Sequence, residues 1–243
     1  MPDTPEAPPV SILGEKDETG LDRIATGSAL GVAAAILAII FPIVFLLFAA
    51  YAPGGFLALN QPGLLDAIGI LIIAGAILYL LSLFIYRRAF AALRKVDERF
   101  WLASILCLIG TLGFLLMLIA AAVVIGSTNS LLSCVSGHPS HALTCLRSGE
   151  PLGAYTGLIG FWLGWLGGLG IVLGLSAGSS RFHNRRIGLG AALYALLLLI
   201  LIGPFIALVV SFPGVEYILF LAPILSFLAP VFVFSGVRPI LPE

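Results

Sequence analysis

Six apolar stretches, each long enough to cross a lipid bilayer, limit what this chain can fold into more than any other feature. A helix needs about 20 apolar residues to span the hydrocarbon core of a membrane. The stretches do not alternate as barrel strands would, and backbone groups inside a bilayer must be satisfied within each element, so we expect helices. The expected spans are residues 29–52, 67–86, 101–125, 155–177, 187–212 and 217–237.

The small number of charges supports a lipid environment. Of the 243 residues, 60% are hydrophobic and 10% are charged, whereas soluble domains have roughly 25% charged residues. The sequence therefore predicts an all-α integral membrane helical bundle with six transmembrane helices. Five helices are the alternative, because Pro223 and Pro230 interrupt the last stretch. A formal net charge of zero argues against nucleic-acid binding.

The distribution of basic residues predicts the orientation in the membrane, because Lys and Arg near helix ends stay on the cytoplasmic side. Of the 12 Lys and Arg residues, Arg147 alone lies in a loop on the expected outer side. We therefore expect both termini to be cytoplasmic and the protein to lie in the cell membrane. The basic residues of the expected inner side are Lys16, Arg23, Arg87, Arg88, Arg94, Lys95, Arg99, Arg181, Arg185, Arg186 and Arg238.

The same pattern predicts three parts along the chain. Residues 1–27 are polar and rich in proline and acidic residues, and we interpret them as a cytoplasmic tail. Residues 28–238 form the helical bundle, in which residues 126–154 are an outer loop, and residues 239–243 form a second cytoplasmic tail.

The fourth span carries glycines every three or four residues, with one turn skipped. At 100° per residue they lie on one face, opposite Trp162. Small residues let another helix approach closely, which drives helix association in lipid. We expect this face to pack within the bundle or, alternatively, against another subunit or a second copy of the chain. The glycines are Gly153, Gly157, Gly160, Gly164, Gly167, Gly174 and Gly178.

The outer loop holds two cysteines and two histidines in the pattern Cys-x3-His-x2-His-x3-Cys. A disulfide between Cys134 and Cys145 is the first interpretation, because disulfides persist outside the cytoplasm and would restrain the loop. The alternative is a metal site formed by Cys134, His138, His141 and Cys145, which offer two thiolates and two imidazoles. The two interpretations exclude one another for the thiols.

The spans contain no charged residue at mid-membrane, where a charge would mark a functional site. Asp66 and Glu216 lie at expected outer helix ends. We also find no phosphate-binding glycine loop, nucleophile elbow, zinc helix or haem motif. We therefore expect a protein that is not an enzyme and that binds no cofactor.

Three segments carry a family resemblance: residues 86–100, the glycine-rich residues 167–175 leading to Arg181, and Gly203-Pro204. They resemble the archaeal family of multi-pass membrane proteins known as DUF973. The resemblance implies an archaeal cell membrane, and it supplies no catalytic residue and no assigned activity.

These observations favour a non-catalytic accessory or scaffolding subunit of a larger membrane complex, with lipid and other membrane proteins as its partners. The alternative is a permease or channel for a small solute, lined by the proline-containing spans 187–212 and 217–237. A second alternative is an extracytoplasmic metal-handling protein that uses the outer loop.

Overall fold

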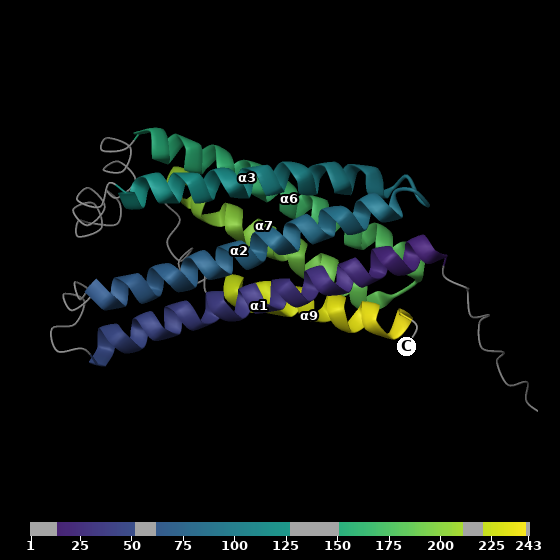
Figure 1. Ribbon diagram of the computed structural model, residues 1–243, viewed down its shortest axis with the longest axis horizontal. Helices are drawn as coiled ribbons and strands as arrows, with labels where there is room; N and C mark the ends of the chain where they lie inside the picture. The colour runs from purple at the N-terminus through teal and green to yellow at the C-terminus, as the bar shows by residue number, and fades with distance from the viewer. Residues whose placement is uncertain (1–13, 52–61, 127–150, 211–220, 242–243) are drawn as a thin grey trace, which may run out of the picture.

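Six long helices make up most of the described part of the chain, and each is long and apolar enough to cross a membrane. The computed structural model describes residues 14–51, 62–126, 151–210 and 221–241 (Figure 1). The expected all-α bundle of six membrane-spanning helices is confirmed. The elements are α1 (Glu15–Tyr51), α2 (Pro62–Leu93), α3 (Phe100–Gly126), α6 (Pro151–Phe182), α7 (Arg185–Val210), α9 (Leu221–Val237) and a short 3-10 helix, η2 (Arg238–Ile240).

The exposed surface of the helices is apolar, as expected of a protein surrounded by lipid. Leu199 on α7 is 66% exposed and Ile159 on α6 is 56% exposed. Many more large apolar side chains are exposed along α2, α3 and α9. Water would penalise so large an apolar surface, whereas lipid does not. The chain is a multi-pass membrane protein.

Helix α1 begins inside the segment, residues 1–27, that the sequence predicts to be a polar tail. It starts at Glu15, so residues 15–27 are helical. Leu21 and Ile24 in this part are almost fully buried, and Gly20 lies against the side chain of Leu93 at the end of α2. The apolar residues of this segment thus pack against α2, which extends the helix beyond the stretch that the hydropathy pattern indicates.

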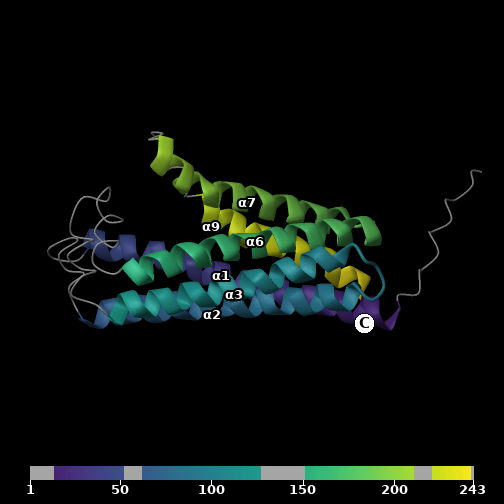
Figure 2. The ribbon, with the colours of Figure 1, turned by 90° about the horizontal axis from the view of Figure 1, so that it is seen from above.

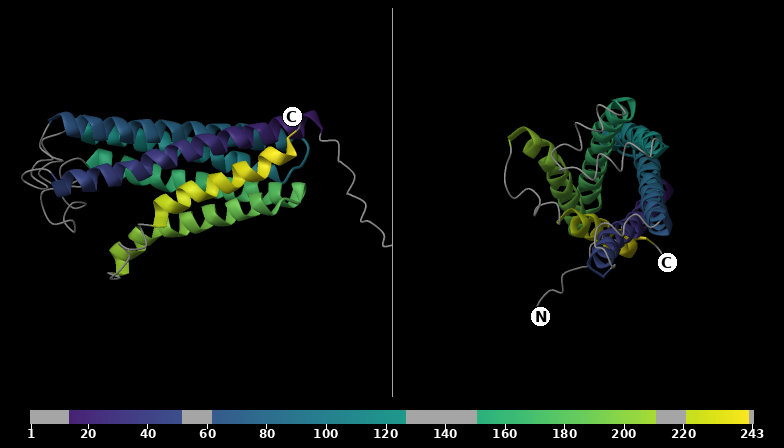
Figure 3. Two further views of the ribbon diagram at one scale, coloured as in Figure 1. Left: turned by 90° about the horizontal axis from the view of Figure 1, so that it is seen from below. Right: turned by 90° about the vertical axis from the view of Figure 1, so that its left-hand side faces the viewer.

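The helices form a closed ring in the order of the sequence. Each helix packs against the next one along the chain, and α9 returns to pack against α1. The view along the bundle in Figure 3 shows this ring, and Figure 2 shows α7 diverging from its neighbours towards one end. The start of α1 and the end of η2 lie at the same end of the bundle (Figure 1), as an even number of crossings requires. We call this end, which also holds the α2–α3 and α6–α7 turns, the basic end.

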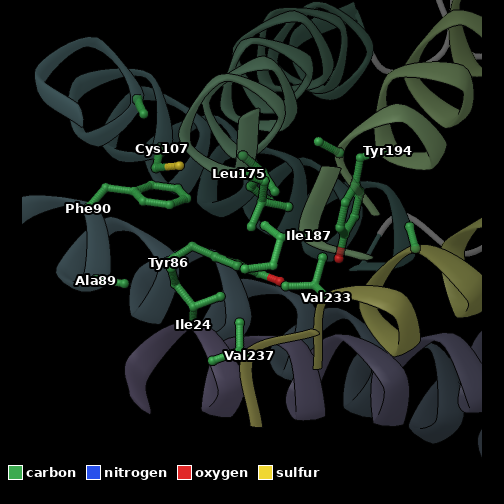
Figure 4. Packing of buried hydrophobic residues seen from close by; sticks show 14 of the residues in the cluster. Ile24, Tyr86, Ala89, Phe90, Cys107, Leu175, Ile187, Tyr194, Val233 and Val237 are labelled. Atoms are coloured by element: carbon green, nitrogen blue, oxygen red, sulfur yellow. The ribbon is translucent and has the colours of Figure 1, made fainter. Parts of the chain in front are cut away.

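Aromatic side chains fill the ring near the basic end. Tyr86, Phe90 and Phe100 are fully buried, and their rings stack in series with centroid separations of 5.9 Å and 6.1 Å. Leu175 and Ile187 approach them from α6 and α7 (Figure 4). Buried aromatic and aliphatic side chains therefore occupy the centre of the ring near the basic end.

Candidate functional site

The most closely packed contact in the bundle is a glycine seam between α3 and α6. Gly110 and Gly167 face one another so closely that a Cβ on either would overlap the backbone of the other. A Cβ on Gly113 would lie 2.5 Å from the backbone nitrogen of Gly164. A Cβ on Gly170 would lie 2.9 Å from the carbonyl oxygen of Ala103. Larger residues at these positions would hold the two helices apart, so glycine is what permits the contact.

The glycines singled out in the fourth span have different surroundings. A Cβ on Gly160 would lie 2.7 Å from the carbonyl oxygen of Gly113, and one on Gly157 would lie 3.5 Å from the Cβ of Ala120, so both glycines face α3. Nothing lies within 4 Å of a Cβ placed on Gly178. The surroundings of Gly153 fall outside the described side chains. The part of the stripe that faces α3 is therefore occupied by the same chain.

The sequence reasoning named only the α6 side of this seam. Gly110 and Gly113 on α3 form the other side. Their spacing of three residues within an apolar span is the signal that could have identified them, because it puts two small residues on one helix face.

Trp162 lies away from the seam, where its side chain is 42% exposed. Its ring packs edge to face against Trp165, with centroids 6.3 Å apart. The indole N–H of Trp165 donates a hydrogen bond of 3.1 Å to the carbonyl oxygen of Leu198, which links α6 to α7. The two tryptophans thus join the outer surface of α6 to its contact with α7.

Three hydroxyl groups meet inside the ring, and we call Ser28, Tyr86 and Tyr194 the hydroxyl cluster. The hydroxyls of Ser28 and Tyr86 lie 2.8 Å apart in a buried hydrogen bond, and the Tyr194 hydroxyl interacts with that of Tyr86. The Ser28 hydroxyl also donates to the carbonyl oxygen of Ile24 at 2.7 Å. Figure 4 shows the two tyrosine hydroxyls pointing toward one another.

The hydroxyl cluster joins three helices, α1, α2 and α7, through polar groups. A second buried bond runs alongside it, from the Ser82 hydroxyl to the carbonyl oxygen of Gly27 at 2.7 Å. Every buried side-chain polar atom in the described part of the chain has a hydrogen-bond partner. Hydroxyls alone supply no strong base or nucleophile, so the cluster can orient helices or contact a neutral solute.

An ion-pair cluster ties three separate elements together at the basic end. The Arg181 guanidinium at the end of α6 donates two hydrogen bonds, of 3.2 Å and 3.0 Å, to the two carboxylate oxygens of Asp17. It also lies 3.7 Å from a carboxylate oxygen of Asp97 in the α2–α3 turn. The Asp17 side chain is only 11% exposed. Sequence reasoning assigned Arg181 to topology and missed this pairing, because 164 residues separate Arg181 from Asp17.

The predicted disulfide and metal ligands, Cys134, His138, His141 and Cys145, lie outside the described residues, as does Glu216. The remaining cysteine, Cys107, is buried in α3. Its thiol lies 3.8 Å from the carbonyl oxygen of Gly167, within the glycine seam. Cys107 thus packs as a small side chain.

Comparison with known proteins adds no relative. No family model matches the chain, and neither a curated protein nor a solved structure is significantly similar to it. The resemblance to the archaeal DUF973 family therefore stays a prediction from the sequence.

Proposed function

We propose that this multi-pass membrane protein is a non-catalytic accessory or scaffolding subunit of a larger membrane complex. The observation that carries the proposal is the filled centre of the ring at the basic end. Tyr86, Phe90 and Phe100 are fully buried there, so aromatic rings occupy the position that a path through the ring would need. A substrate site or a solute path inside the ring would need open space there.

The close packing of the bundle also supports a scaffolding role. The glycine seam locks α3 to α6, and the contact of α9 with α1 closes the ring. Buried hydroxyls and ion pairs hold the same helices together near the basic end. Such a body offers a fixed apolar outer surface on which neighbouring membrane proteins can pack.

The test is to identify neighbours in the native membrane. A photo-crosslinking residue at Leu199 or Ile159, which are exposed, should give adducts with a distinct protein. The same residue at Ile171, which is 1% exposed, is the matched control and should give only adducts within the chain. Mild-detergent extraction followed by a native gel and mass spectrometry should then show the same protein co-migrating stoichiometrically. Migration alone, without adducts from the exposed positions, would contradict the proposal.

A permease for a small neutral solute is the second candidate, and the hydroxyl cluster is the observation that favours it. Ser28, Tyr86 and Tyr194 place three hydroxyls inside the ring, and these would contact such a solute in a state in which the packed centre around Tyr86 opens. Liposomes containing the purified chain separate the two proposals. A scaffold leaves solute flux equal to that of empty liposomes. Flux that Tyr86→Phe changes and Tyr155→Phe does not would favour the permease.

A further inference from the structure

An open groove lies at the basic end, between the α6–α7 turn and the end of α9. Its volume is about 400 Å³, within the range of roughly 300–1,000 Å³ typical of small-molecule sites. The groove is lined by His183, Asn184, Arg185, Arg186, Ser235 and Pro239, and we call it the turn groove.

Hydrogen bonds fix the walls of the turn groove. The side chain of Asn184 accepts a 2.9 Å bond from the backbone N–H of Arg186, as a helix N-cap does. Its amide group donates a 2.8 Å bond to the carbonyl oxygen of Gly236 in α9. The Ser179 hydroxyl donates to the carbonyl oxygen of Asn184 at 3.0 Å. The turn is thus joined to both α6 and α9, and the groove has a defined shape.

The described side chains that line the turn groove give it a positive charge. Arg185 is exposed and forms no hydrogen bond or ion pair with any described residue. Arg186 donates one long bond, of 3.4 Å, to the carbonyl oxygen of Ser235, which uses one of its five N–H donors. Within residues 14–51, 62–126, 151–210 and 221–241, no acidic residue lines the groove. Two neighbouring arginines with unused N–H donors supply the positive charge and the hydrogen-bond donors that a phosphate group requires.

The position of the turn groove indicates where the phosphate comes from. The groove lies where three membrane-crossing helices, α6, α7 and α9, end together. Helix ends lie at the level of the lipid headgroups, and basic pockets between helices on the cytoplasmic side suit anionic headgroups. We infer that the turn groove binds the phosphate group of an anionic phospholipid.

The preference of basic residues for the cytoplasmic side explains why arginines lie at this end of the bundle, but arginines anywhere in the turn would satisfy it. It does not explain why two of them line a groove that hydrogen bonds hold open. A specific lipid site therefore predicts a difference between these arginines and other basic residues of the same end.

The experiment measures lipid retention by the purified full-length chain. Native mass spectrometry in mild detergent would follow titrations with phosphatidylglycerol, phosphatidylcholine and inorganic phosphate. The variant Arg185→Gln/Arg186→Gln removes both guanidiniums. Its matched control, Arg94→Gln/Lys95→Gln, removes two exposed basic side chains from the α2–α3 turn at the same end.

We expect phosphatidylglycerol to bind the wild-type chain and phosphatidylcholine to bind far more weakly. Losing one guanidinium should weaken phosphatidylglycerol binding about fivefold, so losing both should weaken it roughly 30-fold. The control variant should change this binding less than about twofold. Equal losses in both variants would overturn the inference, because binding would then reflect general basic charge. Competition by inorganic phosphate at the affinity of the lipid would overturn it in favour of a soluble phosphate.

Arg186 also touches α9, so the double variant could disturb the fold. The single variant Arg185→Gln avoids this effect, since Arg185 forms no hydrogen bond or ion pair with any described residue. It should weaken phosphatidylglycerol binding about fivefold with an unchanged melting temperature. Unchanged lipid binding in this variant would also overturn the inference.

Discussion

Replacing Gly113 by alanine should push α3 away from α6. The new Cβ would lie 2.5 Å from the backbone nitrogen of Gly164 and 2.7 Å from the carbonyl carbon of Leu163. Ordinary contact begins at 3.4 Å, so the helices must separate locally by about 0.9 Å, the difference between 3.4 and 2.5 Å. Both atoms are backbone atoms, so a change of rotamer cannot remove the overlap.

The energetic cost follows from this overlap. An overlap with rigid backbone atoms falls in the upper part of the cost of overpacking, about 2–3 kcal/mol, and the higher helix propensity of alanine offsets about 1 kcal/mol of it. We expect a net loss of about 1–2 kcal/mol, which for a chain of this length lowers the melting temperature by about 2–8 °C. The assay is thermal unfolding of the purified protein in one detergent, followed by circular dichroism and by loss of the monodisperse gel-filtration peak.

Gly178→Ala is the matched control on α6. Its Cβ would meet nothing within 4 Å, so the substitution should leave the melting temperature unchanged or raise it slightly through helix propensity. A Gly113→Ala protein that melts at or above the wild-type temperature would refute the reasoning. So would an equal loss of stability in both variants, because the effect would then not depend on the seam.

Three further predictions concern the other contacts. Asp17→Asn removes the carboxylate that binds Arg181 and should lower stability by about 1–2 kcal/mol, between the values for exposed and buried ion pairs. The control variant Glu15→Gln changes an exposed carboxylate and should melt like the wild type. Equal melting temperatures of the wild type and both variants would count against the ion-pair cluster. Tyr86→Phe removes the hydroxyl that contacts those of Ser28 and Tyr194 and should cost about 1–3 kcal/mol, the usual value of two buried hydrogen bonds. The same thermal unfolding measures it, and no loss would mean that the hydroxyl cluster does not stabilise the bundle. Maleimide should label Cys134 and Cys145 only after reduction. It should label Cys107, which is 0% exposed, only after denaturation. Labelling of Cys134 and Cys145 after chelation alone would instead favour a metal site.

The positions of the membrane helices could be predicted from the sequence because the bilayer fixes the length of an apolar run. The run 101–125 nearly coincides with α3 (Phe100–Gly126) for this reason. The start of α1 could not be predicted in the same way. Its first turns carry charged residues, and the apolar Leu21 and Ile24 become informative only once α2 is known to lie beside them.

The sequence alone did not predict which helices pack against one another. Glycine spacing in α6 indicated a close contact but not that α3 makes it, because an apolar helix surface looks alike to many partners in lipid. The pairing of Arg181 with Asp17 likewise depends on the ring, which brings the end of α6 close to the start of α1. Local patterns predicted the elements, whereas the contacts between distant segments set the hydroxyl and ion-pair clusters.

Both proposals rest on a ring that crosses the membrane six times with its basic end in the cytoplasm, and labelling of two engineered cysteines tests this most directly. Lys16→Cys and Arg238→Cys place single exposed thiols at the start of α1 and just after α9, in a chain whose native cysteines are replaced. We expect a membrane-impermeant maleimide to label neither thiol in intact cells and both after lysis. Labelling of only one in intact cells would mean an odd number of crossings, and labelling of both would place the basic end outside.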